Sequence, residues 1–243
     1  MVHTPIIILV EPQLAENIGA VARAMGNCNL NKLRLVKPRD GWPNQSAYAM
    51  ASGADPILDY ADVFSTLEHA LADLNYVYAT TARHREMVRL TYTPHAAARD
   101  MYNLTQNNQK IGIVFGPERT GLSNDHVSLC HATISVPLNP KFSSLNLAQA
   151  VLLVGYEWYQ ISHTTLEHEL VTNKTSLAEH KEVLNFFIYL EKQLIDKGFL
   201  ENQQKRSLMI RNIRNIFQRS NLTEQDVSTL YGIVKFLSED KKQ

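Results

Sequence analysis

The feature that most limits the possible folds of this chain is a series of short, continuous apolar runs. The first run, Ile6 to Val10, is built from isoleucine, leucine and valine without polar alternation. Such a run is typical of a strand buried on both faces of a parallel sheet. Further strands are predicted at residues 33–36, 76–80, 111–115 and 133–136. Helix-forming segments separate these runs, and that alternation predicts an α/β fold with a parallel sheet.

Helix signals follow several of the predicted strands. Asn17 is placed to cap a helix over residues 18–25, and Gly26 is placed to end it. The segment 145–161 is apolar on most sides, which indicates burial against the sheet or in a subunit interface. Further helices are predicted at residues 46–52, 67–74 and 94–104. These helices supply the covering layers that a parallel sheet requires.

The alternation of strands and helices stops after residue 162. Residues 163–177 are polar and lose periodicity, which predicts a linker. Three helices are then predicted, at about 177–197, 205–218 and 223–238, the last capped by Thr223. The predicted organisation is an α/β domain at 1–162, the linker, and a small helical extension at 178–243.

Charge separates this extension from the rest of the chain. The formal net charge is zero, so no overall basic field indicates a nucleic-acid partner. Residues 203–219 nevertheless carry five basic residues and no acidic one. This stretch is either the solvated face of an ordinary helix or a surface that follows phosphates, with Arg211 and Arg214 as RNA contacts.

Other residue types narrow the class of protein. Cys28 and Cys130 lie far apart, with no zinc-type spacing, which favours a reducing cytoplasm. No apolar run is long enough for a signal segment or a membrane span. His126 and His131 are five positions apart, so they do not share a helical face and no metal site is predicted. The motifs of P-loop hydrolases, dinucleotide-binding folds and serine hydrolases are missing from the sequence.

Three polar clusters remain, each after a predicted strand, where α/β sheets bind ligands. The first is Asn17-x-Gly19-x-x-x-Arg23, which by itself is more typical of a capped helix bearing an exposed arginine than of a phosphate or ribose site. The second is the glycine-rich loop from Phe115 to Ser123, which contains Glu118. The third is the serine-rich segment ending Ser143-Ser144-Leu145-Asn146, which by itself is typical of a helix cap.

In this order and spacing, the three clusters resemble the three motifs of the SPOUT superfamily of RNA methyltransferases. Those motifs read N-x-G-x-x-x-R, G-x-E-x-x-G-L and S-S-L-N-[LV]-A, and the resemblance spans Ile6 to about Ile161. The extension, with Gly198-Phe199-Leu200 ahead of its basic helix, resembles that of a bacterial tRNA-modifying branch. Enzymes of that branch methylate the 2′ oxygen of a cytidine or uridine ribose in tRNA. The resemblance therefore implies that the target is the nucleotide at position 32 of the anticodon loop.

The resemblance implies a fold, a cofactor and partners. The fold would be an α/β parallel sheet whose C-terminal segment is threaded into a trefoil knot, an exception to the general absence of knots. The methyl donor would be S-adenosylmethionine, with no metal, and the partners would be tRNA and a second copy of the chain. The implied cofactor-binding residues are Thr80, Thr81, Ala82, Gly116, Val136, Ser144, Leu145 and Asn146.

The resemblance also assigns roles on the acceptor side. Arg23 is the implied lead catalytic residue, and Asn17, Ser144 and Asn146 would hydrogen-bond around the acceptor. A guanidinium pKa above about 12 makes proton removal by Arg23 costly, so a phosphate clamp that orients the hydroxyl is the preferred role. Gly19, Glu118 and Gly121 are assigned to the framework of the motifs. Arg83 and Arg85, directly after the donor loop, are assigned to tRNA phosphates, with a plain solvated loop as the alternative.

Two alternatives remain open. One is a ribosomal RNA ribose methyltransferase of the same superfamily, which the helical extension argues against. The other is a catalytically silent RNA-binding homologue, which the presence of Asn17, Arg23, Glu118 and Asn146 together argues against.

Overall fold

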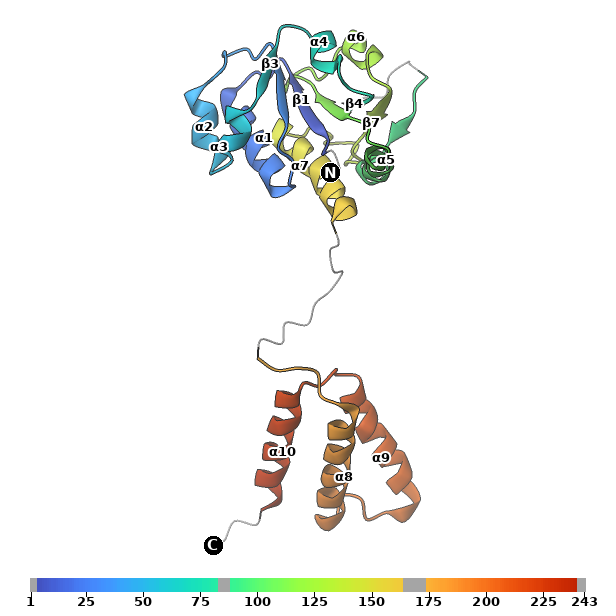
Figure 1. Cartoon of the computed structure of the whole chain (residues 1–243). Helices are drawn as coiled ribbons and strands as arrows, with labels where there is room; N and C mark the ends of the chain where they lie inside the picture. Colours follow the sequence, from blue (N-terminus) through green and yellow to red (C-terminus); the bar gives the residue numbers. More distant parts are fainter. Residues whose placement is uncertain (1–3, 83–87, 164–173, 240–243) are drawn as a thin grey trace. The chain divides into compact units, whose positions relative to one another are not determined.

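The computed structural model describes residues 4–82, 88–163 and 174–239 of the chain. The chain divides into two compact units, Met1–Thr165 and Leu166–Gln243. The first unit holds a seven-stranded sheet with helices on both faces, and the second holds three helices (Figure 1). The predicted linker lies largely outside the described residues.

The sheet of the first unit is parallel throughout, which confirms the predicted fold class. Its strands run in the order β3-β2-β1-β6-β4-β7-β5. Their bounds are β1 Ile6–Val10, β2 Leu33–Val36, β3 Asp62–Phe64, β4 Tyr76–Thr80, β5 Thr91–Tyr92, β6 Ile111–Phe115 and β7 Ala132–Ile134. Strands β3 and β5 were not predicted because each has at most three residues, lies at an edge and contains no buried residue. The strand order does not test the trefoil knot, which stays a prediction.

Helices cover the two faces of the sheet unequally. Figure 1 shows α4 and α6 on one face and the other helices of this unit on the opposite face. The bounds are α1 Ala15–Asn27, α2 Gln45–Ala51, α3 Asp55–Asp59, α4 Leu67–Leu71, α5 Pro94–Gln106, α6 Asn124–Ser128 and α7 Leu147–Ser162. Alternate residues of β1 enter the two cores: Ile7 and Leu9 pack in one, and Ile6, Ile8 and Val10 in the other. This double burial explains the continuous apolar run.

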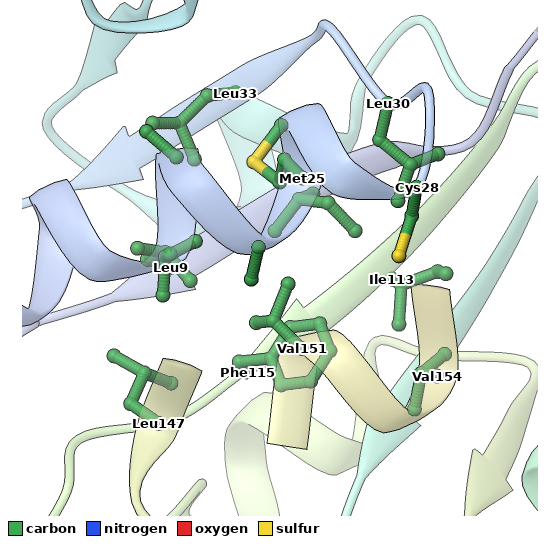
Figure 2. Packing of buried hydrophobic residues seen from close by; sticks show 14 of the residues in the cluster. Leu9, Met25, Cys28, Leu30, Leu33, Ile113, Phe115, Leu147, Val151 and Val154 are labelled. Carbon is green, nitrogen blue, oxygen red and sulfur yellow. The ribbon is translucent and has the colours of Figure 1, made fainter. Parts of the chain in front are cut away.

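The larger core lies between β1, β6 and the helices α1 and α7. Met25 of α1 and Val151 and Val154 of α7 meet Leu9 and Phe115 there, and each is at most 1% exposed (Figure 2). Complete burial of such side chains contributes ~1.5–3 kcal/mol each, so this contact is a main source of stability. The contact fixes α7 against the sheet, and with it the segment that precedes α7.

The start of α1 differs from the prediction. The helix begins at Ala15 rather than after Asn17, its N-cap is Leu14, and Gly26 lies inside the helix. The chain just before the helix is held from elsewhere, because the Glu118 carboxylate accepts hydrogen bonds from the backbone nitrogens of Gln13 (2.8 Å) and Leu14 (3.4 Å). A carboxylate about 100 positions away therefore anchors the residues that lead into α1, and Asn17 is not the cap that the sequence predicted.

Gly19 has a packing role within the framework of the first motif. A methyl group at this position would collide with the carbonyl oxygen of Ala47 in α2. The close approach that the glycine permits is therefore an approach of α1 to α2, rather than to a ligand.

The second unit consists of α8 His180–Asp196, α9 Gln203–Gln218 and α10 Glu224–Ser238, as the sequence predicted within a few residues. Thr223 caps α10, as predicted, by accepting a hydrogen bond from the backbone nitrogen of Asp226. The small core of the unit lies mainly on α8, around Phe186 and Phe187. None of the residues of α9, all of which the structure describes, is buried. Within the described residues, no helix is both long enough and apolar enough to span a membrane.

Candidate functional site

A pocket of about 300 Å³ opens at the carboxyl edge of the sheet, where three loops meet. The loops follow β4, β6 and β7, which are neighbours or near neighbours in the sheet. Most of the residues predicted to bind the cofactor line it, and they are Thr80, Thr81, Ala82, Gly116, Val136, Ser144 and Leu145. Asn146 does not line the pocket. The size lies at the lower end of the range for small-molecule sites.

The walls of this pocket combine apolar side chains with backbone. Leu122, Ile134 and Leu138 supply apolar surface between the polar loop segments. A methyl group on Gly116 would collide with the backbone nitrogen of Leu122, so only glycine allows the loop to close on itself. Gly121 in the same loop has a φ of 65°, a conformation that glycine adopts without strain. The arrangement suits a ligand with a flat apolar part that is recognised by backbone groups.

Hydrogen bonds join all three motifs beside this pocket. The Asn17 side-chain nitrogen donates to Glu118 Oε1 over 2.7 Å. The Asn17 side-chain oxygen in turn accepts from Asn146 Nδ2 over 3.1 Å. Glu118 therefore acts as a hub that holds the start of α1 and, through Asn17, the start of α7.

Asn146 is also the N-cap of α7. Its side-chain oxygen accepts from the backbone nitrogen of Ala148 over 2.8 Å, while Gln149 closes the capping box. The prediction placed Asn146 just inside the helix, and the structure places it at the cap. Both ends of its amide are thus engaged, which suits a positioning role for Asn146 in the single chain. Ser143 and Ser144, before the cap, are exposed at the pocket mouth.

Arg23 lies apart from the pocket of its own chain. It follows Asn17 by six positions along α1, is exposed, and donates from Nη1 to Ser52 Oγ over 3.3 Å. It is not among the residues that line the pocket. The structure thus brings Asn17, Glu118 and Asn146 together and leaves the predicted lead residue on a separate face of α1.

Of the four arginines predicted to contact RNA, the structure describes two, Arg211 and Arg214, which lie on α9 of the second unit. Arg83 and Arg85 lie outside the described residues. Arg214 makes a two-point ion pair with Glu191 of α8, at 2.6 and 3.0 Å. Arg211 donates from Nε to the carbonyl oxygen of Ser207 in its own helix.

Two cysteines and two histidines outside the three motifs have roles in the fold. Cys28 and Cys130 are free and buried, and burial raises the pKa of the Cys130 thiol to about 12. His126 caps α6 together with Ser123. His131 accepts a hydrogen bond from the backbone nitrogen of Val77. Among the described residues, no group of three or more histidines, cysteines or carboxylates could hold a metal ion.

Sequence reasoning did not identify three apolar residues of the pocket wall, which are Leu122, Ile134 and Leu138. Leu122 is the apolar residue that ends the second motif, and an apolar side chain at that place in the loop could have indicated a wall. Ile134 and Leu138 carried no such signal, because their positions depend on where β7 ends.

Glu118→Gln is expected to lower the free energy of unfolding of the first unit by about 1–3 kcal/mol. The substitution keeps the size of the side chain but replaces a charged acceptor oxygen with a donor that faces other donors. Thermal unfolding followed by tryptophan fluorescence measures the effect, because Trp42 and Trp158 both belong to this unit. Glu16→Gln, at an exposed position on α1, is the matched control, and equal stability of the two variants would contradict the hub role.

Both units of the chain are similar in sequence to known RNA methyltransferases. Residues 4–156 match the profile of the SpoU rRNA Methylase family. Residues 181–243 match the profile named tRNA methyltransferase TrmJ, C-terminal domain. The tRNA (cytidine/uridine/adenosine-2'-O-)-methyltransferase TrmJ of Pseudomonas aeruginosa is 36% identical over 94% of this chain and 91% of its own. The tRNA (cytidine/uridine-2'-O-)-methyltransferase TrmJ of Citrobacter koseri is 33% identical over 97% of each chain.

Solved structures show the same similarity in three dimensions. The crystal structure of TrmJ from Z. mobilis ZM4 superposes with a TM-score of 0.83 at 42% identity, and the match covers 98% of this chain and 100% of that one. A probable methylase family protein from Haemophilus influenzae superposes with a TM-score of 0.61 at 31% identity, over 97% and 96% of the two chains. The similarity therefore includes both units of the chain.

Proposed function

Because the chain belongs to the SpoU rRNA Methylase family, we propose that it transfers a methyl group from S-adenosylmethionine to the 2′ oxygen of a ribose in tRNA. Relatives named as tRNA 2′-O-methyltransferases match nearly the whole chain. The observation that carries the proposal is the pocket formed by the loops after β4, β6 and β7, tied by Glu118 to the other motifs. The target is the cytidine or uridine at position 32 of the anticodon loop.

The donor pocket fits the proposed cofactor in its chemistry. Gly116 and Gly121 line the pocket and carry no side chain, so this part of its wall is backbone. Leu122, Ile134 and Leu138 offer apolar surface for the adenine ring, and the loop at Thr80–Ala82 offers polar groups. S-adenosylmethionine supplies a methyl group that is activated by the positive charge on its sulfur. These residues need only bind and orient, and a metal is not required by the proposal.

On the acceptor side, the proposed task of the protein is to orient the 2′ hydroxyl of the target ribose. Arg23 is proposed to clamp the phosphate next to the target ribose and so to aim the 2′ hydroxyl at the donor pocket. Ser144, exposed at the pocket mouth, is proposed to hydrogen-bond to the acceptor. Asn17 and Asn146, whose amides are mutually bonded, would hold the start of α7 and the donor loop in register.

The position of Arg23 supports the proposal of a homodimer. Because Arg23 does not line the pocket of its own chain, we propose that it serves the pocket of a second copy. Two exposed apolar groups suit such an interface: Leu152, Leu153 and Tyr156 on α7, and Leu14 and Met50 near α1 and α2. Covering them on association would bury apolar surface and join two half-sites.

The helical unit favours tRNA over ribosomal RNA. Its residues 181–243 match a profile named for a tRNA methyltransferase. Residues 178–243, the basic helix included, are therefore proposed as the tRNA-binding extension, joined by the linker at 163–177 to the methyltransferase domain at 1–162. Since tRNA is the proposed substrate, the cytoplasm stays the predicted compartment.

The test is to map methylated nucleosides by mass spectrometry after incubating unmodified bulk tRNA with the pure protein and S-adenosylmethionine. The expected products are 2′-O-methylcytidine and 2′-O-methyluridine from the anticodon loop. Methylation of a base would overturn the proposal. Methylation of ribosomal RNA with tRNA unchanged would support the first alternative, and no transfer to either RNA would support the silent homologue.

A further inference from the structure

A second and larger cleft, of about 540 Å³, lies at the amino edge of the same sheet. It is lined at the amino ends of β1, β2 and β6 and by α3, and it shares no residue with the donor pocket. It is called the amino-edge cleft below. Parallel strands place the two cavities at opposite ends, so this cleft belongs to neither the donor nor the acceptor site proposed above.

A buried guanidinium forms one wall of the amino-edge cleft. Arg34 is 8% exposed and bonds from both Nη atoms to Asp73 (2.6 and 2.9 Å) and from Nη1 to the carbonyl oxygen of Ala70. The hydrogen bond from Arg34 holds the pKa of Asp73 at about 2, so this carboxylate stays charged. Arg34 Nε is buried and finds no acceptor among the described residues. A buried donor without a partner is rare in proteins, and the guanidinium that carries it lies over the ring of Phe64, 5.5 Å from the ring centroid.

The floor of the cleft is apolar and its rim carries an aromatic ring. Ile6, Ile57 and Ile111 line the cleft from two strands and α3. Tyr60, just after α3, lines it as well and is 81% exposed. A ring so exposed beside an apolar floor offers a stacking face, which is how proteins hold nucleobases without regard to sequence.

Charged groups of both signs complete the lining. Lys32, Arg34 and Lys110 face two carboxylates, Asp62 and Asp73, so cations exceed anions by three to two. Lys110 lies 3.6 Å from Asp73, and both lysines are exposed at the rim. Exposed ammonium groups suit a phosphate, whereas an exposed carboxylate such as Asp62 suits the amino group of a base.

We propose that the amino-edge cleft binds a phosphorylated nucleotide that carries an exocyclic amino group. The base stacks on Tyr60 over the isoleucine floor, Asp62 accepts from the amino group, and Lys32 and Lys110 contact the phosphate. The nucleotide is either part of a bound RNA or a free mononucleotide.

Methyl NMR of the full-length protein tests the cleft directly. With the isoleucine δ1 methyls labelled, cytidine 5′-monophosphate is expected to shift the signals of Ile6, Ile57 and Ile111. Ile134 lines the donor pocket and serves as the internal control. Unmoved cleft methyls at millimolar nucleotide would overturn the proposal, and so would an equal shift with inorganic phosphate alone.

Variants connect the shifts to the named side chains. Tyr60→Ala and Lys110→Glu are each expected to weaken the binding of cytidine 5′-monophosphate roughly tenfold. Both side chains are exposed, so folding is expected to survive. Lys181→Glu, an exposed lysine of the second unit, is the matched charge control. Unchanged affinity in both cleft variants would refute the assignment.

Bulk tRNA distinguishes the two sources of the nucleotide. If RNA is the source, tRNA shifts the cleft methyls and Tyr60→Ala weakens tRNA binding. If a free mononucleotide is the source, tRNA leaves these methyls unmoved while cytidine 5′-monophosphate shifts them. S-adenosylmethionine binding and methyl transfer are measured separately, so failure of this inference leaves the proposed function standing.

Discussion

Replacing Arg23 with alanine is expected to reduce the rate of methyl transfer to tRNA by about 100-fold or more. The expected loss follows from the proposed role of Arg23, which is to hold the phosphate beside the target ribose. Without this positioning group, S-adenosylmethionine still binds, but the 2′ hydroxyl is no longer held in line with the methyl group. Single-turnover transfer of labelled methyl groups at saturating tRNA measures the effect.

Two controls make the Arg23→Ala result specific. Affinity for S-adenosylmethionine is expected to be unchanged, because Arg23 does not line the donor pocket. Folding is expected to survive, since the side chain is exposed and its hydrogen bond to Ser52 is 3.3 Å long. Arg99→Ala, an exposed arginine on α5, is the matched control and should retain activity. Near-normal transfer by folded Arg23→Ala protein would remove Arg23 from the mechanism.

Mixed dimers test whether Arg23 serves the second copy. An Arg23→Ala chain is combined with a chain whose donor pocket is blocked by Gly116→Val. If Arg23 acts across the interface, one of the two sites in the mixed dimer pairs an intact arginine with an intact pocket, and activity returns. If Arg23 acts within its own chain, both sites stay defective. Recovery in the mixture therefore supports the shared site, and its absence contradicts it.

Deleting residues 165–243 is expected to weaken tRNA binding by roughly tenfold or more while leaving S-adenosylmethionine affinity unchanged. The two units have separate cores, so the first unit retains its sheet and both layers of helices. The basic helix α9 is lost with the deletion. Filter binding at several salt concentrations measures the affinity for tRNA, and calorimetry measures the affinity for S-adenosylmethionine.

A finer variant identifies which charges of α9 act on RNA. Arg214 is paired with Glu191, so its charge is partly neutralised within the unit. Arg211 bonds only to a carbonyl oxygen of its own helix among the hydrogen bonds and ion pairs described, which leaves its charge without a described carboxylate partner. Arg211→Gln is therefore expected to lower tRNA affinity more than Arg214→Gln. Equal tRNA affinity for the truncated and complete chains would refute a role for the whole extension.

The sequence predicted most of the fold because its signals are local. The runs at Ile6–Val10 and 111–115 are strands with the predicted bounds, and the three helices of the extension lie within a few residues of their predicted positions. Continuous apolar runs arise whenever both faces of a strand are buried, so this pattern needs no knowledge of the partner elements. The edge strands β3 and β5 were not predicted, because neither contains a buried residue and so neither shows a hydrophobic pattern in the sequence.

The sequence also indicated segments that the structure brings together, since Thr80–Ala82, Gly116 and Ser144–Leu145 all line one pocket. Tertiary structure decided what individual side chains do. Asn17 bonds to Glu118 and Asn146, at separations of 101 and 129 residues, and so does not cap α1. Local propensity ranks Asn17 as a cap because it considers only the neighbouring backbone, whereas a carboxylate brought close by the sheet is a stronger partner. The separation of Arg23 from the pocket and the amino-edge cleft around Arg34 likewise exist only once distant strands lie side by side.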